Sequence, residues 1–186
     1  MSRASVLWFE GDSKGQRASS RVDSVTQALV RRGVGTDARG IAVLNGHVHA
    51  LHLQAEPGKF RATELDEVTE FFAGALQSPS NLFWVAHEAS PVGYLWAEEI
   101  FRPETPFTHA ERLLYIHHLA VDPTARRTGV ARALCLALER EAAARHVSRL
   151  ALDHWSFNSD AGDFFSAVGF AEYNVKMRKR LTGNSG

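Results

Sequence analysis

The chain has 186 residues, of which 45% are hydrophobic and 23% charged, the composition of a single globular domain that can bury a sizeable core. Its 21 Lys and Arg balance 21 Asp and Glu, which argues against a protein that binds nucleic acid or anionic membranes, because such proteins carry a basic excess. No apolar run is long enough for a membrane span or a secretory signal, and a single cysteine, Cys135, excludes an internal disulfide and predicts a cytoplasmic location.

The first 25 residues differ from the rest of the chain. They are polar, rich in Ser and Gly, and they lack a clear hydrophobic period. We interpret residues 1–25 as an extension, either disordered or not native to the domain. Residues 26–182 are then expected to form one folded domain.

Helical and extended patterns alternate along this domain. Helical spacing of apolar residues predicts helices at 36–54, 63–77, 128–145 and 158–168. Runs of β-branched and aromatic residues predict strands at 26–32, 81–88, 90–101, 112–121, 148–155 and 170–181. Thr36 or Asp37 would cap the first helix, and Thr63 with Asp66 would form a capping box on the second. Because hairpins are mixed with strand–helix–strand crossovers, we expect an α/β fold with a mixed sheet.

The segment Arg126–Arg132 (RRTGVAR) stands where a predicted strand turns into a long helix. A glycine-bearing helix start exposes backbone N–H groups and the positive end of the helix dipole, which suits an anion such as phosphate. The three arginines add positive charge, and Gly129 and Ala131 allow a ligand to approach the backbone. An ordinary helix start with solvated arginines is the alternative. The pattern is neither a Walker loop nor a GxGxxG motif, so a phosphate-bearing ligand of another type is expected.

Two motifs in this order resemble those of the GCN5-related N-acetyltransferase (GNAT) family. Residues 126–131 resemble its Arg/Gln-x-x-Gly-x-Gly/Ala signature and follow the strand YIHHLAVDP, as in that family. Downstream, NSDAGDFFSAVGF at 158–170 resembles the family's Asn-x-x-Ala-x-x-x-Tyr-x-x-x-Gly-Phe segment. The resemblance covers about residues 26–181. It implies a GNAT-like fold: a mixed, mostly antiparallel sheet with a splayed central strand pair and flanking helices.

The resemblance also implies a reaction, the direct transfer of an acetyl group from acetyl-CoA to a primary amine. The turn at 126–132 would hold the CoA pyrophosphate through backbone amides, and the main chain of the preceding strand would pair with the pantetheine arm. The implied cofactor-binding residues are Leu119, Ala120, Val121, Arg126, Arg127, Thr128, Gly129, Val130, Ala131, Arg132, Asn158 and Phe165. The acceptor would be a small-molecule or peptide amine, and similar proteins are commonly homodimers.

An amine must lose a proton before it attacks, and three residues are candidates for the acid–base chemistry. His117 stands where similar enzymes have a Glu, so it is the candidate base, with a structural strand histidine as the alternative. Tyr115 shares its strand face, whereas His118 points the other way unless a bulge intervenes. Tyr173 lies in the closing strand. No metal is expected, because His49 and His52 alone do not make a zinc site.

The usual general-acid tyrosine of the family falls at Phe165, which has no hydroxyl. Three outcomes stay open: Tyr115 or Tyr173 replaces it, solvent protonates the CoA thiolate, or the protein binds CoA with little turnover. The last outcome defines a rival, a CoA-binding sensor module. A nucleotide-binding protein is a second rival, disfavoured because no Walker lysine or acidic ribose-binding residue falls at the expected place.

Several residues near the expected acceptor cleft have two interpretations. Four acidic residues could attract a cationic amine or form a solvated rim: Glu98, Glu99, Glu104 and Glu111. Three aromatic residues could line the acceptor pocket or belong to the core or a dimer contact: Trp96, Phe101 and Phe107.

Overall fold

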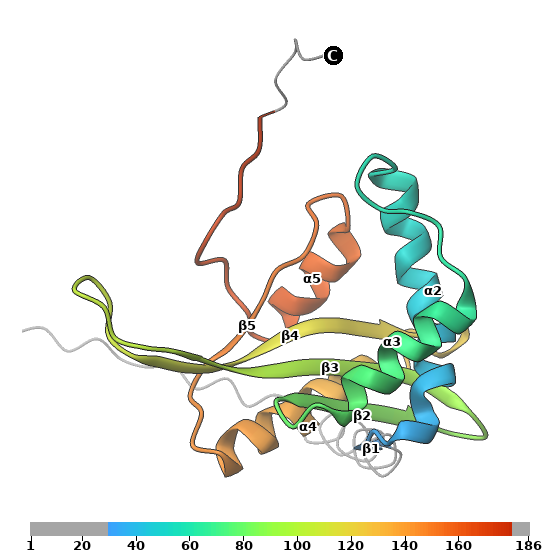
Figure 1. The fold of residues 1–186 in the computed structure, drawn as a ribbon, viewed down its shortest axis with the longest axis horizontal. Coiled ribbons are helices and arrows are strands. Elements are labelled where there is room, and N and C mark those ends of the chain that lie inside the picture. Colours follow the sequence, from blue (N-terminus) through green and yellow to red (C-terminus); the bar gives the residue numbers. More distant parts are fainter. Residues whose placement is uncertain (1–29, 180–186) are drawn as a thin grey trace, which may run out of the picture. The chain divides into compact units, whose positions relative to one another are not determined.

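The computed structural model describes residues 30–179 (Figure 1). These residues form two compact units that divide between Asp153 and His154. The extension expected at residues 1–25 lies outside the described residues. None of the helices within 30–179 is long and apolar enough to cross a membrane.

The first unit is built on a five-stranded sheet with the order β1-β2-β3-β4-β5 (Figure 1). The strands are β1 (Val30–Arg32), β2 (Asn81–His87), β3 (Pro91–Arg102), β4 (Glu111–Val121) and β5 (Leu150–Leu152). The first four are antiparallel neighbours, and β5 pairs with β4 in parallel. This mixed, mostly antiparallel sheet with flanking helices confirms the expected fold class.

Helices cover both faces of this sheet. On one face lie α2 (Ala38–Ala55) and α3 (Leu65–Gln77), whose Phe72 packs edge-on against Tyr94 of β3 with ring centroids 5.7 Å apart. On the other lies α4 (Val130–Ala144), whose Val130 and Leu134 pack on Gly93 of β3. Successive residues of a strand point to opposite faces, so Gly93 and Tyr94 face different helices. The middle of β3 is therefore buried on both sides, as is β2 from Leu82 to Ala86.

Two helix starts differ from the predicted caps. Asp37 precedes α2, but its carboxylate does not cap the helix and instead pairs with both terminal nitrogens of Arg31 at 2.7 Å. α3 follows Glu64, which has no side-chain cap bond, so the capping box of Thr63 and Asp66 does not form. Thr63 stands two residues before the helix begins, which separates it from the free amides that a cap must reach.

The β4–β5 pair is short, and among residues 30–179 no other strand pairs with that edge of β4. Only Leu114–Ile116 pair with Leu150–Leu152, so β5 is shorter than the predicted strand at 148–155. β4 continues to Val121 beyond its last partner in β5. The two strands are thus paired over three residues only and are unpaired toward the carboxyl end of β4, which is the splayed arrangement that the family resemblance implied.

A β-bulge interrupts the pairing of β3 with β4. Trp96 pairs with His118 and the next residue, Ala97, pairs with Ile116, so His117 is the extra residue. A bulge places two consecutive residues opposite one and changes the alternation of side chains.

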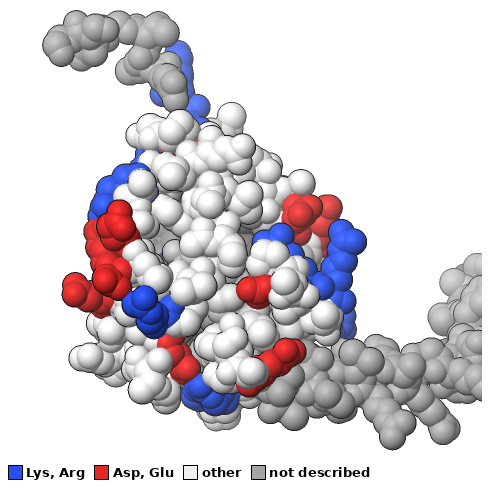
Figure 2. Space-filling view, turned by 90° about the vertical axis from the view of Figure 1, so that its right-hand side faces the viewer, with Lys and Arg blue, Asp and Glu red and all other residues white. Residues whose placement is uncertain are grey.

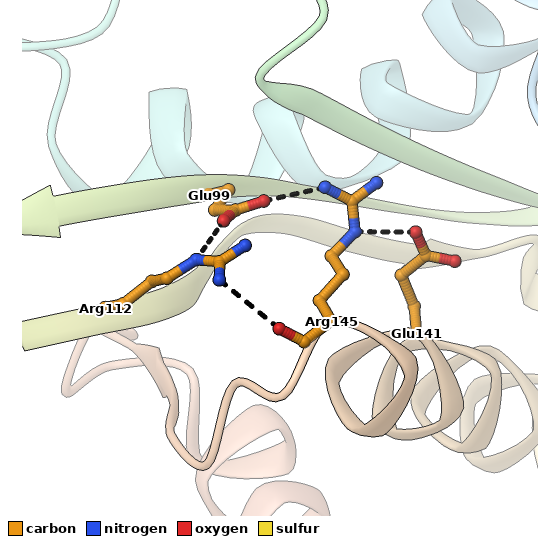
Figure 3. Close-up of polar contacts among 4 residues, drawn as sticks. All are labelled: Glu99, Arg112, Glu141 and Arg145. Carbon is orange, nitrogen blue, oxygen red and sulfur yellow. Dashed lines mark hydrogen bonds and ion pairs between the residues drawn. The ribbon is translucent and has the colours of Figure 1, made fainter.

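A four-residue cluster of ion pairs connects the far end of α4 to the sheet (Figure 3). Glu99 on β3 binds Arg112 of β4, and its other oxygen accepts a hydrogen bond from Arg145 at 2.7 Å. Arg145 follows the last residue of α4 and also pairs with Glu141 at 2.7 Å. The cluster therefore joins two strands and the carboxyl end of a helix.

The second unit contains α5 (Ser159–Ala167). The Asn158 side chain caps this helix by accepting a hydrogen bond from Ala161 N–H at 3.2 Å. The predicted strand at 170–181 is wrong for its described part, because residues 170–179 have no regular secondary structure. A strand needs a hydrogen-bonded neighbour, and residues 154–179 contain no other strand.

Candidate active site

The turn that precedes α4 has a conformation suited to an anion. Thr128 Oγ1 donates to the Ala125 carbonyl at 2.7 Å, and both Arg127 (φ 63°) and Gly129 (φ 92°) adopt left-handed backbone conformations. For a non-glycine residue such as Arg127 this conformation is uncommon, and such strain clusters at ligand sites. Alternation of left- and right-handed residues turns consecutive N–H groups toward a common concavity.

The first turn of α4 is left without a cap. Gly129 is the N-cap residue and no side chain accepts from the helix. The first backbone bond runs from Ala133 N–H to the Gly129 carbonyl at 2.9 Å, which leaves the amides of residues 130–132 outside the helical ladder. Arg126, Arg127 and Arg132 are exposed around this point. Free amides, the helix dipole and three guanidinium groups together suit a pyrophosphate.

The edge of β4 lies directly before this turn. Residues 119–121 are beyond the last pair with β5, and no strand within 30–179 pairs with them on that side, so the strand edge suits an extended ligand. Asp122 follows, and its N–H donates to the Val92 carbonyl at 2.9 Å, which holds the start of the turn against β3. A ligand bound at α4 could therefore continue along the edge of β4.

The bulge brings His117 and His118 to the same face of the sheet. His118 contacts Phe72 of α3, with ring centroids 6.0 Å apart, and so faces α2 and α3. His117 contacts Tyr115, with centroids 5.1 Å apart, on the same face. Trp96 lies against both imidazoles, at 4.6 Å and 5.0 Å. The alternation of side chains along a regular strand would have placed His118 on the opposite face, and the bulge is what brings it to this one.

His117 is oriented by a carboxylate. Its Nε2 lies 2.8 Å from Glu98 Oε2, and both side chains are partly exposed. A carboxylate only accepts hydrogen bonds, so Nε2 is the donor in this contact and Nδ1 is the ring nitrogen left to exchange a proton with a ligand. An imidazole held in this way by an acidic partner has the arrangement of a general base and its orienting group.

His118 has a different environment, because its ring is largely buried. Its Nδ1 lies 3.1 Å from Tyr94 Oη and 3.3 Å from Asn45 Nδ2, and Asn45 also donates to Tyr94 Oη at 2.9 Å. Burial, followed by the nearby charge of His117, lowers the pKa of His118 to about 4. Burial also raises the pKa of Tyr94, so this chain of groups stays uncharged near neutral pH.

A cavity of about 230 Å³ opens beside these residues, between α2 and α3. Its walls combine aliphatic and aromatic groups with a few polar ones: Asn45, His49, Arg61, Thr63, Glu67, Val68, Phe71, Phe72 and His118. The face shown in Figure 2 has basic and acidic side chains interspersed among the described residues. The candidate base His117 and a cavity lined by its neighbour His118 thus lie on the same side of the sheet.

Comparison with known proteins identifies the family. The model of the acetyltransferase (GNAT) family matches residues 47–170, well over half of the chain. The chain belongs to the GNAT family of acetyltransferases. This confirms the family expected from Arg126–Ala131 and the expected class of enzyme, an N-acetyltransferase. A search of curated proteins found no match to this GNAT chain.

Solved structures share the GNAT fold. The tetramutant of protein BH1408 from Bacillus halodurans is 25% identical, with a TM-score of 0.78 over 82% of this chain and 99% of that one. The aminoglycoside 6'-N-acetyltransferase AAC(6')-IG from Acinetobacter haemolyticus is 17% identical, with a TM-score of 0.61 over 82% and 98%. A predicted acetyltransferase from Clostridium acetobutylicum, solved with acetyl-CoA, is 20% identical, with a TM-score of 0.61 over 82% and 95%.

The remaining predicted residues of this GNAT chain lie in the second unit. Asn158 caps α5, and Phe165 on that helix packs edge-on against Phe170 with centroids 5.5 Å apart. Tyr173 belongs to the irregular segment after α5 and is exposed. The structure does not relate these residues to the histidine face, so their assigned roles stay predictions.

Sequence reasoning missed the partners of the two histidines. It treated Glu98 as one of several rim residues and did not consider Asn45 or Tyr94. A signal was available in β3, since Tyr94, Trp96 and Glu98 alternate along one strand and the period-two rule brings them near one face. Nothing local in the sequence pairs that face with His117.

Proposed function

We propose that this protein transfers the acetyl group of acetyl-CoA to a primary amine by direct attack, without a covalent enzyme intermediate. The observation that carries the proposal is the uncapped start of α4, where Arg127 and Gly129 turn the backbone amides outward beside the open edge of β4. The acetyl-CoA present in the Clostridium acetobutylicum structure, which shares the fold, supports this choice of cosubstrate.

Two parts of the chain would hold acetyl-CoA. The amides of residues 130–132, with Arg126, Arg127 and Arg132, would bind the pyrophosphate through charge-assisted hydrogen bonds. The main chain of residues 119–121 would pair with the amide groups of the pantetheine arm, as a further strand would. Bound acetyl-CoA would supply an activated thioester at these residues.

His117 and Glu98 would handle the proton of the acceptor. A lysine-like amine with a pKa near 10.4 costs about 4.6 kcal/mol to deprotonate at neutral pH. His117 Nδ1 would accept that proton, directly or through a water, while Glu98 stabilises the resulting imidazolium. The amine nitrogen bonds to the thioester carbonyl carbon, the carbon–sulfur bond breaks, and the thiolate takes a proton from Tyr115, Tyr173 or solvent.

The alternative function is a CoA-binding sensor with little turnover, favoured by the absence of a hydroxyl at Phe165. Phe165→Tyr separates the two functions. If a missing acid limits the rate, the variant raises thiol release at saturating acetyl-CoA. No gain at any pH would count against that account. We further propose a cytoplasmic homodimer acting on a small-molecule or peptide amine.

Calorimetric titration with acetyl-CoA, ATP and NAD tests the proposal. We expect micromolar binding of acetyl-CoA alone, followed by release of free thiol when an amine is added. Gly129→Glu should abolish binding, because its side chain fills the turn and places a negative charge beside the pyrophosphate. Gly74→Glu is the matched control, since a β-carbon at this exposed helix position meets nothing within 4 Å. Equal affinity in the two variants would refute the pyrophosphate site.

A further inference from the structure

One ring nitrogen of His118, Nε2, takes no part in the buried hydrogen bonds with Asn45 and Tyr94. Its Nδ1 faces the amide nitrogen of Asn45, which can only donate, and the hydroxyl of Tyr94, which accepts from that same amide. Nδ1 is therefore the hydrogen-bond acceptor of the ring, and the proton of the neutral imidazole sits on Nε2. Among the residues that the structure describes, no group is hydrogen-bonded to Nε2.

The same ring lines the cavity between α2 and α3. Because Nδ1 is hydrogen-bonded to Asn45 and Tyr94, the only polar group of the ring left for a ligand in the cavity is the Nε2–H donor. The arrangement is rigid, because the ring is also wedged against Phe72 and Trp96. A fixed, neutral donor in a largely apolar site is satisfied best by an oxygen atom of a ligand, since a buried N–H without a partner is costly.

The charged side chains of the cavity and His49 are already paired. Arg61 and Glu67 form a two-pronged ion pair with each other, one contact of which is 3.2 Å. His49 Nε2 donates to the Arg61 carbonyl at 2.7 Å. No charge is thus left over to select an ionic substituent, and Val68, Phe71 and Phe72 supply an apolar wall.

The geometry points to His118 as a specificity-determining residue that binds a hydrogen-bond-accepting oxygen of the acceptor. The acceptor class is then an amine whose apolar or aromatic body carries a carbonyl or hydroxyl oxygen, as in an amino amide or the N-terminus of a peptide. The cavity holds this body while the amine reaches His117, the neighbouring residue on the same face. This assignment rests on the proposed acetyl transfer.

Nitrogen-15 NMR of histidine-labelled full-length protein tests the oxygen site without turnover. The probe is phenylacetamide, which has the aromatic body and the carbonyl but no amine, and 2-phenylethylamine, which lacks oxygen, is its control. We expect phenylacetamide to shift the His118 Nε2–H resonance in a saturable way and the control to leave it unchanged. No saturable shift of that resonance would overturn the inference, whatever the result with acetyl-CoA.

Two variants then separate recognition from structure. The amide of His118→Asn mimics Nδ1 and keeps the contact with Tyr94, whereas that of His118→Gln mimics Nε2 and keeps the cavity donor. The measured quantity is the ratio of kcat/KM for phenylalaninamide to that for 2-phenylethylamine, which cancels general losses of activity. We expect this ratio to fall about tenfold in the Asn variant and less in the Gln variant. A ratio that His118→Asn leaves unchanged would overturn the inference, and failure of acetyl-CoA to bind would instead refute the proposed function.

Discussion

A β-carbon at Gly93 would lie 2.8 Å from Cγ1 of Val130, so the first residue of α4 sits directly on the glycine of β3. The carbonyl of Ala120 would be 3.2 Å from the same carbon. Position 93 therefore fixes how closely the helix start and the open edge of β4 approach the middle of the sheet. The site that we propose for pyrophosphate depends on a residue that it does not contain.

Gly93→Ala is expected to weaken acetyl-CoA binding about tenfold and to destabilise the fold by about 1–3 kcal/mol, because the added methyl must displace Val130. Calorimetry and thermal unfolding measure the two effects. Gly74→Ala is the control, since it adds the same methyl to an exposed helix position. Wild-type affinity in Gly93→Ala would show that the close packing does not position the turn.

Glu98→Gln removes the charge that orients His117 while keeping the size of the side chain. We expect kcat/KM to fall at least tenfold, and the acidic limb of its pH profile to move, because the variant no longer stabilises the imidazolium. Thiol release measured across pH gives both quantities. Glu88→Gln, at the exposed β2–β3 turn, controls for the loss of one negative charge. An unshifted pH profile would exclude Glu98 as the positioning residue of His117.

The cluster in Figure 3 predicts a pH-dependent contribution to stability. Arg112, followed by Arg145, lowers the pKa of Glu99, so the stabilisation is present above the ordinary carboxyl pKa and is lost as the pH falls through the lowered value. Glu99→Gln should therefore cost about 1–2 kcal/mol at pH 7 and progressively less in acid. Urea unfolding at several pH values measures this difference. A cost independent of pH would assign it to packing instead.

Buried His118 predicts a second dependence of folding stability on pH, in a different pH range. Its pKa is about 4 in the folded protein against 6.5 for the free side chain, so the unfolded chain binds a proton first as the pH falls. Stability should decrease between pH 6.5 and 4 by about 3 kcal/mol from this group. His118→Phe should lose this part of the slope, although it is less stable at neutral pH. Parallel curves for both proteins would contradict the neutral buried imidazole.

Local patterns predicted most elements of the fold, because the helical or strand period of apolar residues can be recognised within a short segment of sequence. The turn at Arg126–Ala131 could be predicted for the same reason, since its pattern lies within a few consecutive residues. The strand predicted at 170–181 was not found in its described part, since a strand depends on a neighbour as well as on its own residues. Thr63 failed as a cap because the helix begins later, and the ends of elements depend on tertiary contacts.

The candidate site was only half predictable, because its geometry comes from register. Glu98 and His117 are separated by 19 residues in sequence, and their contact follows from the pairing of β3 with β4. His118 was assigned to the opposite face unless a bulge intervened, and the bulge depends on how Trp96 and Ala97 pair across the sheet. Neither relation leaves a signature in a single strand.

The bulge at His117 also bears on how sequences of this kind can be compared. β4 is one residue longer than the part of β3 that it pairs with, and this surplus brings two consecutive imidazoles to one side of the sheet. A relative whose strand lacks the surplus would need an alignment gap at this point. An alignment without that gap would match His117 or His118 to a residue on the wrong side of the sheet, and would transfer the wrong role to it.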